Sequence, residues 1–293
     1  MPRRPTDDHA RAGRHVRRRR TRAAADADRR AAAYLAGVST RRVFPDAAAL
    51  AGLARVDEPL PEVGEDAAAT LALLDATGSP ATVASNGPRY FGFVVGAALP
   101  TAAPAERLLL AWDQNAQAWD NSPAAATLEV VAAGWVLDAL NLPLESAVGF
   151  GTSATACNVS GREAARRTLP APAGWDIDRD GRTGAPAVRA VVSETVHVSV
   201  TNALRVLGFG LGRLVVAPTA AQGRVDPARL PALDARTILC LQAGKVNTGE
   251  FDLFAELVPR AQARGTWVHV DGAFGLWARA SRAAAPLVGQ LAC

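Results

Sequence analysis

Short apolar runs alternate with stretches of helical periodicity through the second half of the chain. Such runs are rich in β-branched residues and are typical of buried strands, whereas the stretches between them place apolar residues at helical spacing. The predicted strands are 188–194, 213–218, 237–243 and 266–271, with a short strand and turn at 148–153, and the predicted helices are 154–167, 199–207 and 251–264. This alternation predicts an α/β domain over 146–293, with a mostly parallel sheet covered by helices on both faces.

The chain between residues 31 and 145 has a mainly helical pattern. Three prolines interrupt its first part, and 102–140 reads as two helices that are separated at Pro123. Ser122 and Pro123 fit the N-cap and first-turn positions of the second of these helices. We therefore expect an N-terminal helical segment and linker helices over 31–145.

The first thirty residues are strongly basic. They contain eleven arginines and four aspartates without apolar periodicity, so we predict a disordered, Arg-rich tail over 1–30. Because the whole chain has a net charge of only +4, the remainder is net negative. Nucleic-acid binding by the tail is an alternative, but the tail has no aromatic residue to stack a base and no folded module around it, which makes a nucleic-acid partner the weaker prediction.

The cysteines and the apolar stretches bear on the compartment. Cys157, Cys240 and Cys293 show neither disulfide-type nor metal-ligand spacing, so we expect reduced thiols and no metal site. No secretory pattern is visible, and the longest apolar stretch, 91–105, is interrupted by two prolines. These features predict a soluble cytoplasmic protein without a membrane partner.

Polar residues gather where the predicted strands end. They are found in 152–155, in 193–197, in 243–248 and at Asp271. Because ligands of parallel α/β sheets bind at the carboxyl ends of the strands, the sequence predicts a binding site at this edge.

Two of these positions suit a flat, phosphorylated ligand. Ser153, Ala154 and Thr155 lie where a turn enters a helix, and free backbone N–H groups at a helix N-terminus bind phosphate. Ser and Thr there can equally be helix caps. His197 follows a strand and could stack on a flat heteroaromatic ring, or it could be a structural cap.

Asp271 ends an otherwise apolar strand. A carboxylate in such a place needs a cationic partner, and a protonated pyridine nitrogen would be one. A helix cap or an arginine partner is the alternative. The small residues Gly272 and Ala273 would let a flat ring approach the backbone, whereas His269, two residues earlier, reads as structural.

Three long segments together resemble the group II pyridoxal-phosphate (PLP) decarboxylases, the family of aromatic amino-acid and glutamate decarboxylases. They are GPRYFGFVVGAALPTAAPAERLLLAWDQN (87–115), GFGTSATACNVSGREAARR (149–167) and AGKVNTGEFDLFAELVPRAQARGTWVHVDGAFGLWA (243–278). The resemblance runs from about residue 31 to 278. It implies a fold-type-I large domain, similar to that of aspartate aminotransferase, with PLP as the cofactor.

The resemblance also implies roles for individual residues. Ser153, Ala154 and Thr155 match the family's phosphate-binding turn, and His197 matches its ring-stacking histidine. Asp271 matches the acid that pairs with the pyridine nitrogen, and Ala273 lies under the opposite ring face. The remaining matches are Asn247 and Thr248, in a loop that approaches the cofactor, and Tyr90 and Phe91, near the substrate entrance and often across a dimer interface.

The chain also departs from the family's pattern. Ser153 replaces a glycine of the phosphate turn, and Asn202 stands where relatives often have a lysine. Lys245 is the only lysine and precedes Asp271, whereas the family's Schiff-base lysine should follow it. The family's C-terminal small domain is also missing. We therefore expect a C-terminally truncated fragment or frameshifted product that is inactive as given.

The complete enzyme is expected to decarboxylate an amino acid, releasing CO2 and an amine, and to form a homodimer. Two alternatives remain open within PLP chemistry, a decarboxylation-dependent aldehyde synthase and an aminotransferase of the same fold. From a different class, the chain could be a non-catalytic paralogue that binds partners through its surface. The absorbance of an internal imine with PLP would separate the PLP enzyme from the non-catalytic paralogue, because a pocket without a lysine cannot form one.

Overall fold

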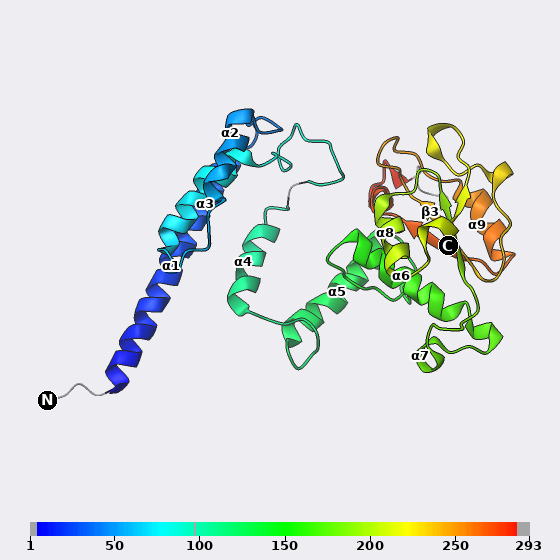
Figure 1. The fold of residues 1–293 in the computed structure, drawn as a ribbon, viewed down its shortest axis with the longest axis horizontal. Coiled ribbons are helices and arrows are strands. Elements are labelled where there is room, and N and C mark those ends of the chain that lie inside the picture. The colour runs from blue at the N-terminus through cyan, green and yellow to red at the C-terminus, as the bar shows by residue number, and fades with distance from the viewer. Residues whose placement is uncertain (1–4, 97, 286–293) are drawn as a thin grey trace. The chain divides into compact units, whose positions relative to one another are not determined.

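The computed structural model describes residues 5–96 and 98–285 of the chain. It divides into two compact units, Met1–Ala111 and Trp112–Cys293 (Figure 1). In the described residues, no helix is long and apolar enough to cross a membrane.

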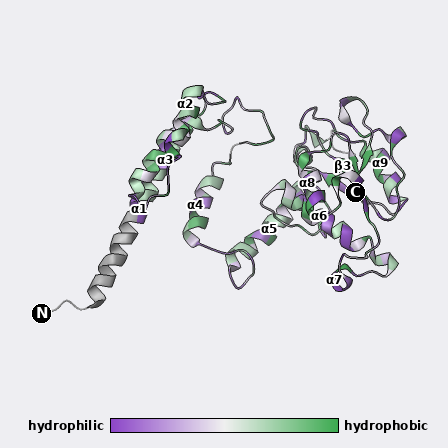
Figure 2. Cartoon of the chain, viewed as in Figure 1, coloured by the Kyte–Doolittle hydropathy of each residue, from purple (hydrophilic) through white to green (hydrophobic). Residues whose placement is uncertain are grey.

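The Met1–Ala111 unit is helical. It is built from α1 (Pro5–Gly37), α2 (Ala47–Gly52), the short 3-10 helix η1 (Leu53–Val56), α3 (Ala67–Ala81) and most of α4 (Ala102–Trp112). The helix α1 packs against α3. Leucines make much of α4 hydrophobic (Figure 2), yet none of its residues is buried.

Helix α1 covers residues 1–30 from Pro5 onward, where the sequence predicts a disordered tail. Alanine and arginine, which dominate this segment, are strong helix formers even without an apolar stripe. Within the helix, Arg30 Nε donates to Asp26 at 3.0 Å, one turn away. Its Nη1 donates to Asp75 of α3 at 2.9 Å, so a polar contact joins the two helices.

The second unit contains a four-stranded sheet in the order β2-β1-β3-β4, with every neighbouring pair parallel. The strands are β1 (Arg189–Ser193), β2 (Val215–Ala217), β3 (Thr237–Gln242) and β4 (Trp267–Asp271). This confirms the predicted parallel α/β fold. Residues 148–153, however, form an irregular turn and not the predicted strand, in keeping with the two glycines there, which disfavour strands.

Helices cover both faces of this sheet, as predicted. The main helices of this unit are α5 (Pro123–Ala139), α6 (Ala154–Thr168), α8 (Val198–Val206) and α9 (Phe254–Gln262); shorter ones are η2 (Ala171–Ala173), α7 (Ile177–Asp180), η3 (Leu211–Arg213), η4 (Ala221–Gly223), η5 (Pro227–Arg229) and η6 (Leu276–Ala280). Helix α5 begins as the sequence predicts, with the Ser122 side chain accepting from Ala125 N and Pro123 in the first turn.

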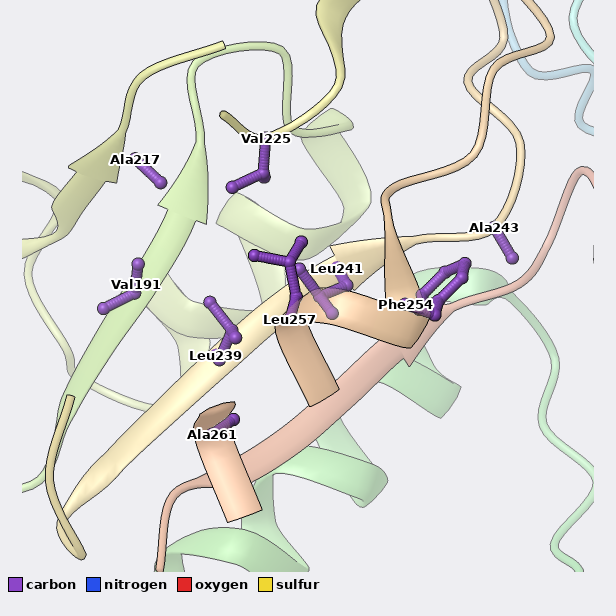
Figure 3. Packing of buried hydrophobic residues seen from close by; sticks show 9 residues of the cluster. All are labelled: Val191, Ala217, Val225, Leu239, Leu241, Ala243, Phe254, Leu257 and Ala261. Atoms are coloured by element: carbon purple, nitrogen blue, oxygen red, sulfur yellow. The ribbon is translucent and has the colours of Figure 1, made fainter. Parts of the chain in front are cut away.

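The strands alternate between two apolar clusters, one on each face. On one face, Leu239 and Leu241 pack with α9 residues such as Leu257 (Figure 3). On the other, Ile238 and Cys240 pack with residues of α6 and α8, among them Leu204. Successive side chains of a strand point to opposite faces, so one nearly continuous apolar run supplies both clusters. The face that carries α6 and α8 also receives His269 and Asp271 of β4.

Candidate active site at the carboxyl edge of the sheet

Asp271 is the last residue of β4 and the centre of a polar cluster. Its Oδ1 accepts a hydrogen bond from Ala273 N at 3.1 Å. Its Oδ2 lies 3.5 Å from both Asn158 Nδ2 and Ser199 Oγ. Two helices and the turn after β4 therefore bring donors to the carboxylate at the end of β4, at the edge where the sequence predicts a site.

Asn158 and Ser199 connect His197 to this carboxylate. Asn158, which is buried in α6, donates from Nδ2 to Ser199 Oγ at 3.1 Å, and Ser199 Oγ is 2.9 Å from His197 Nδ1. Ser199 N also donates to His197 Nδ1 at 3.2 Å, so this ring nitrogen accepts and caps α8. The exposed ring therefore keeps Nε2 for other partners.

His269 lies behind the cluster. Its Nε2 is 3.0 Å from Asn158 Oδ1, an acceptor, so Nε2 carries the proton. Burial, followed by the positive charge of Arg162, lowers the pKa of His269 to about 3, against the opposing charge of Asp271. The imidazole is therefore neutral and supports Asn158, in agreement with its structural reading. A side chain at Gly161 would lie 3.3 Å from this ring, which explains the glycine on the facing helix.

Arg162 follows Asn158 by one turn of α6 and is fully buried. Its Nη1 donates to Asn158 O at 3.0 Å, whereas Nε and Nη2 have no hydrogen-bond partner among the described residues. Burial, against the charge of this guanidinium, raises the pKa of the nearby Cys240 thiol, which is therefore protonated at neutral pH. The buried guanidinium of Arg162 is thus in direct contact with Asn158, a member of the Asp271 cluster.

The predicted phosphate turn lies at the N-terminus of α6. Ser153 is the N-cap, and its Oγ accepts from Ala156 N at 3.1 Å. Its hydroxyl therefore serves the helix, as the capping alternative proposed. Ala154 and Thr155 begin the helix, where N–H groups have no partner within the helix and a positive helix end faces outward.

Asn247 and Thr248 are not joined to the Asp271 cluster. The Thr248 hydroxyl donates to Gln222 O at 3.0 Å, in another loop, and Asn247 is exposed. Their predicted approach to a cofactor stays a prediction. Tyr90 and Phe91 belong to the Met1–Ala111 unit, where Phe91 is 93% exposed, and their role at a substrate entrance likewise stays a prediction.

Lys245 is held in the loop after β3. Its side chain is only 4% exposed, and its Nζ lies 3.4 Å from Asp252 Oδ1 and 3.2 Å from Gln242 Oε1. The Asp252 carboxylate also accepts from Val225 N at 2.9 Å and from Gln242 N at 2.8 Å. This amine is therefore committed to a buried ion pair.

Among the described residues, no group of three or more His, Cys, Asp or Glu side chains could hold a metal ion.

The pattern of the pyridoxal-dependent decarboxylase conserved domain matches residues 55–288, most of the chain. The chain belongs to this family. Family members are PLP-dependent amino-acid decarboxylases, that is, carboxy-lyases.

Several relatives of this decarboxylase family resemble the chain over part of their length. L-2,4-diaminobutyrate decarboxylase of Rhizobium meliloti is 27% identical over 240 residues, which are 77% of this chain and 45% of the relative. Tryptophan decarboxylase 1 of Oryza sativa is 27% identical over 204 residues, 64% of this chain and 40% of the relative. The chain thus spans less than half of these curated relatives.

Solved decarboxylase structures share the fold. The glutamate decarboxylase domain of a diaminobutyrate-pyruvate transaminase and L-2,4-diaminobutyrate decarboxylase from Vibrio parahaemolyticus superposes with a TM-score of 0.76 at 21% identity, covering 91% of this chain and 61% of that one. Oryza sativa TDC with PLP gives a TM-score of 0.73 at 20% identity, covering 99% and 62%.

Sequence reasoning missed the residues that join the Asp271 cluster together. Asn158 and Arg162 lie inside a helix, where polar residues ordinarily face water, and Ser199 reads as a first-turn residue. The available signal was spacing, because Asn158 follows Thr155 by one turn and Ser199 follows His197 by two residues.

Proposed function

We propose that the Asp271 cluster is the PLP-binding part of an amino-acid decarboxylase, whose complete form converts an amino acid to an amine and CO2. The observation that carries this proposal is the network that joins Asp271 at the end of β4 to His197 at the start of α8 through Asn158 and Ser199. Three elements hold an acid and an aromatic ring at one edge of a parallel sheet, which is where such sheets bind ligands.

The residues present fit the cofactor. The first turn of α6, at Ala154 and Thr155, suits the phosphate, since it offers N–H groups and a positive helix end. Asp271 suits the pyridine nitrogen, and the His197 ring and the small Ala273 suit the two faces of the flat ring. When bound, PLP supplies an electron sink for the pair of electrons left behind by departing CO2.

Asp271 would hold a proton on the pyridine nitrogen of bound PLP by charge pairing. Asn158 and Ser199 orient its Oδ2, and Ala273 N orients Oδ1. Neutral His269 fixes the Asn158 amide, so that Nδ2 faces Ser199 and Asp271. Thr155 and Ala154, in the first turn of α6, would hold the phosphate.

We further propose that the chain as given holds PLP without a covalent bond and does not decarboxylate. The family's chemistry needs a lysine that carries the cofactor. Lys245 is the only lysine of the sequence, and its amine is buried against Asp252. The burial of the Lys245 amine also favours a second candidate function, that of a non-catalytic member of the family that retains the cofactor pocket.

The substrate is an amino acid, as in the relatives, and the complete protein forms a homodimer. Support for a subunit contact comes from large apolar side chains that are exposed on helices: Leu110 of α4 is 70% exposed, and Val130 and Trp135 of α5 are 74% and 73% exposed. Apolar surface of this kind marks interaction sites.

A titration with PLP tests the cofactor proposal. PLP bound by the chain is measured by absorbance or fluorescence for the unchanged protein, Asp271→Ala and the control Asp178→Ala. Asp178 is exposed and pairs with Arg167 outside the cluster. We expect Asp271→Ala to weaken binding about tenfold or more, the loss for one charge pair of about 1.4 kcal/mol, and the control to leave it unchanged. Equal binding by all three proteins would refute the assignment.

A further inference from the structure

A cavity lies at the opposite end of the sheet from Asp271. It has a volume of about 650 Å³ and opens beside the first residues of β1, the last turns of α6 and α8, and the segment 182–188. Since Asp271 and His197 mark the carboxyl ends of the strands and Arg189 begins β1, this cavity is separate from the proposed cofactor site.

Arginines dominate its polar lining. Arg166, Arg182, Arg189 and Arg213 contribute to the wall, and no acidic residue does. Two of them have close carboxylate partners: Arg182 lies 2.7 Å from Glu163, and Arg189 lies 3.4 Å from Asp234. These two carboxylates leave the lining with an excess of positive charge.

The other two arginines are poorly compensated. The side chain of Arg166 is only 12% exposed and its Nη1 donates to Leu207 O, yet the nearest carboxylate oxygen, on Glu163, is 4.0 Å away. Burial, and then the charge of Arg182, lowers the pKa of Arg166 against the opposing charge of Glu163. The charged form of Arg166 is therefore disfavoured there. Arg213 is exposed and has no ion pair within the described residues. A bound anion would compensate the charge of Arg166, and Arg213 is free to contact the same anion.

The rest of the wall is apolar. It includes Ile177, Leu207 and Phe209, and the Arg166 guanidinium lies 6.0 Å from the centre of the Phe209 ring. Cavities of several hundred Å³ with apolar walls and a few convergent polar groups are typical of small-molecule sites. Guanidinium groups bind carboxylate and phosphate through paired hydrogen bonds.

We infer that this cavity binds a small organic anion, with its carboxylate or phosphate on Arg166 and Arg213 and its apolar body against Phe209. The combination of an arginine-rich, acid-free lining with an apolar wall carries the inference. The site is independent of the cofactor, because its residues and the Asp271 cluster share no side chain.

Arginine footprinting tests this inference residue by residue. The chain is treated with phenylglyoxal in the presence of benzoate, phenyl phosphate or the neutral benzyl alcohol, and modified arginines are mapped by mass spectrometry. Both anions are expected to slow, severalfold and with saturation, the modification of Arg213, which contacts the head group. They should also slow that of Arg182, which lines the same cavity and is shielded by the occupant. The stronger protector identifies the preferred head group, and benzyl alcohol should protect neither residue.

Internal controls are present in the same molecule. Arg167, adjacent to Arg166 but paired with Asp178, and Arg205, which bonds Asn202, do not line the cavity. Their rates should not change. Arg213→Gln should abolish the protection of Arg182 while PLP binding at the Asp271 cluster stays the same. Equal protection of Arg167 and Arg205, or no protection at all, would overturn the site.

Discussion

The amine of Lys245 lies 3.4 Å from the carboxylate of Asp252, and the two side chains are 4% and 0% exposed. Asp252 also accepts two backbone N–H groups, from Val225 and Gln242. The pair therefore ties the loop after β3 to the end of that strand and to a neighbouring loop. It gives the chain's single lysine a structural task in place of a chemical one.

Breaking this pair should cost considerable stability. Asp252→Ala leaves the Lys245 charge buried without a carboxylate, with only Gln242 Oε1 beside it, and leaves two N–H groups without partners. We expect a loss of about 3–5 kcal/mol in the free energy of unfolding. The measurement is urea denaturation. Glu250→Gln serves as the control, because its pair with Arg224 at 3.6 Å is about one-third exposed and should contribute less than about 1 kcal/mol. Similar losses for both variants would contradict the buried pair.

Asn158 should matter to the cofactor as a positioning residue. Asn158→Ala removes the link between His269, Ser199 and Asp271, so the carboxylate loses its orientation. We expect PLP affinity to fall severalfold and the free energy of unfolding to fall by about 1–3 kcal/mol. The matched control is Asn202→Ala, since Asn202 bonds only the exposed Arg205 in the described structure. An unchanged PLP affinity in Asn158→Ala would remove Asn158 from the site.

Acid should destabilise the fold through His269. Its folded pKa of about 3 lies below the ordinary value of 6.5, so the unfolded chain binds a proton that the folded chain does not. Stability is therefore fully present above about pH 6.5 and falls towards pH 3, by at most about 1.4 kcal/mol per pH unit. Urea denaturation between pH 7 and 5 measures this slope. His269→Asn should flatten it, and identical slopes for the two proteins would exclude His269 as the cause.

The strands and their parallel arrangement could be predicted because each is a short apolar run, and runs such as 237–243 supply both faces of the sheet. Helix α1 could not be predicted in this way, since its sequence has no apolar periodicity and its ion pair with α3, between Arg30 and Asp75, joins residues far apart in the sequence. The turn at 148–153 looked like a strand because Val148 and Phe150 are apolar, although two glycines lie beside them.

The site could be predicted only in its outline. Asp271 and His197 stand at the ends of apolar strands, where their polarity is conspicuous. Asn158 and Ser199 could not be found this way, because only the packing of α6 and α8 on one face shows that they meet. The ion pair of Lys245 with Asp252 could not be predicted either, since the turn that brings the two side chains together has no recognisable sequence pattern.

The central claim is that the Asp271 cluster holds PLP without a covalent bond to Lys245. The most direct measurement adds PLP to the chain, reduces the mixture with sodium borohydride and maps the modified residues by mass spectrometry. In parallel, the release of amine from an amino acid is assayed. The account predicts PLP that dissociates on dialysis, no reduced adduct on Lys245 and no amine. Stoichiometric labelling of Lys245 together with amine production would contradict it.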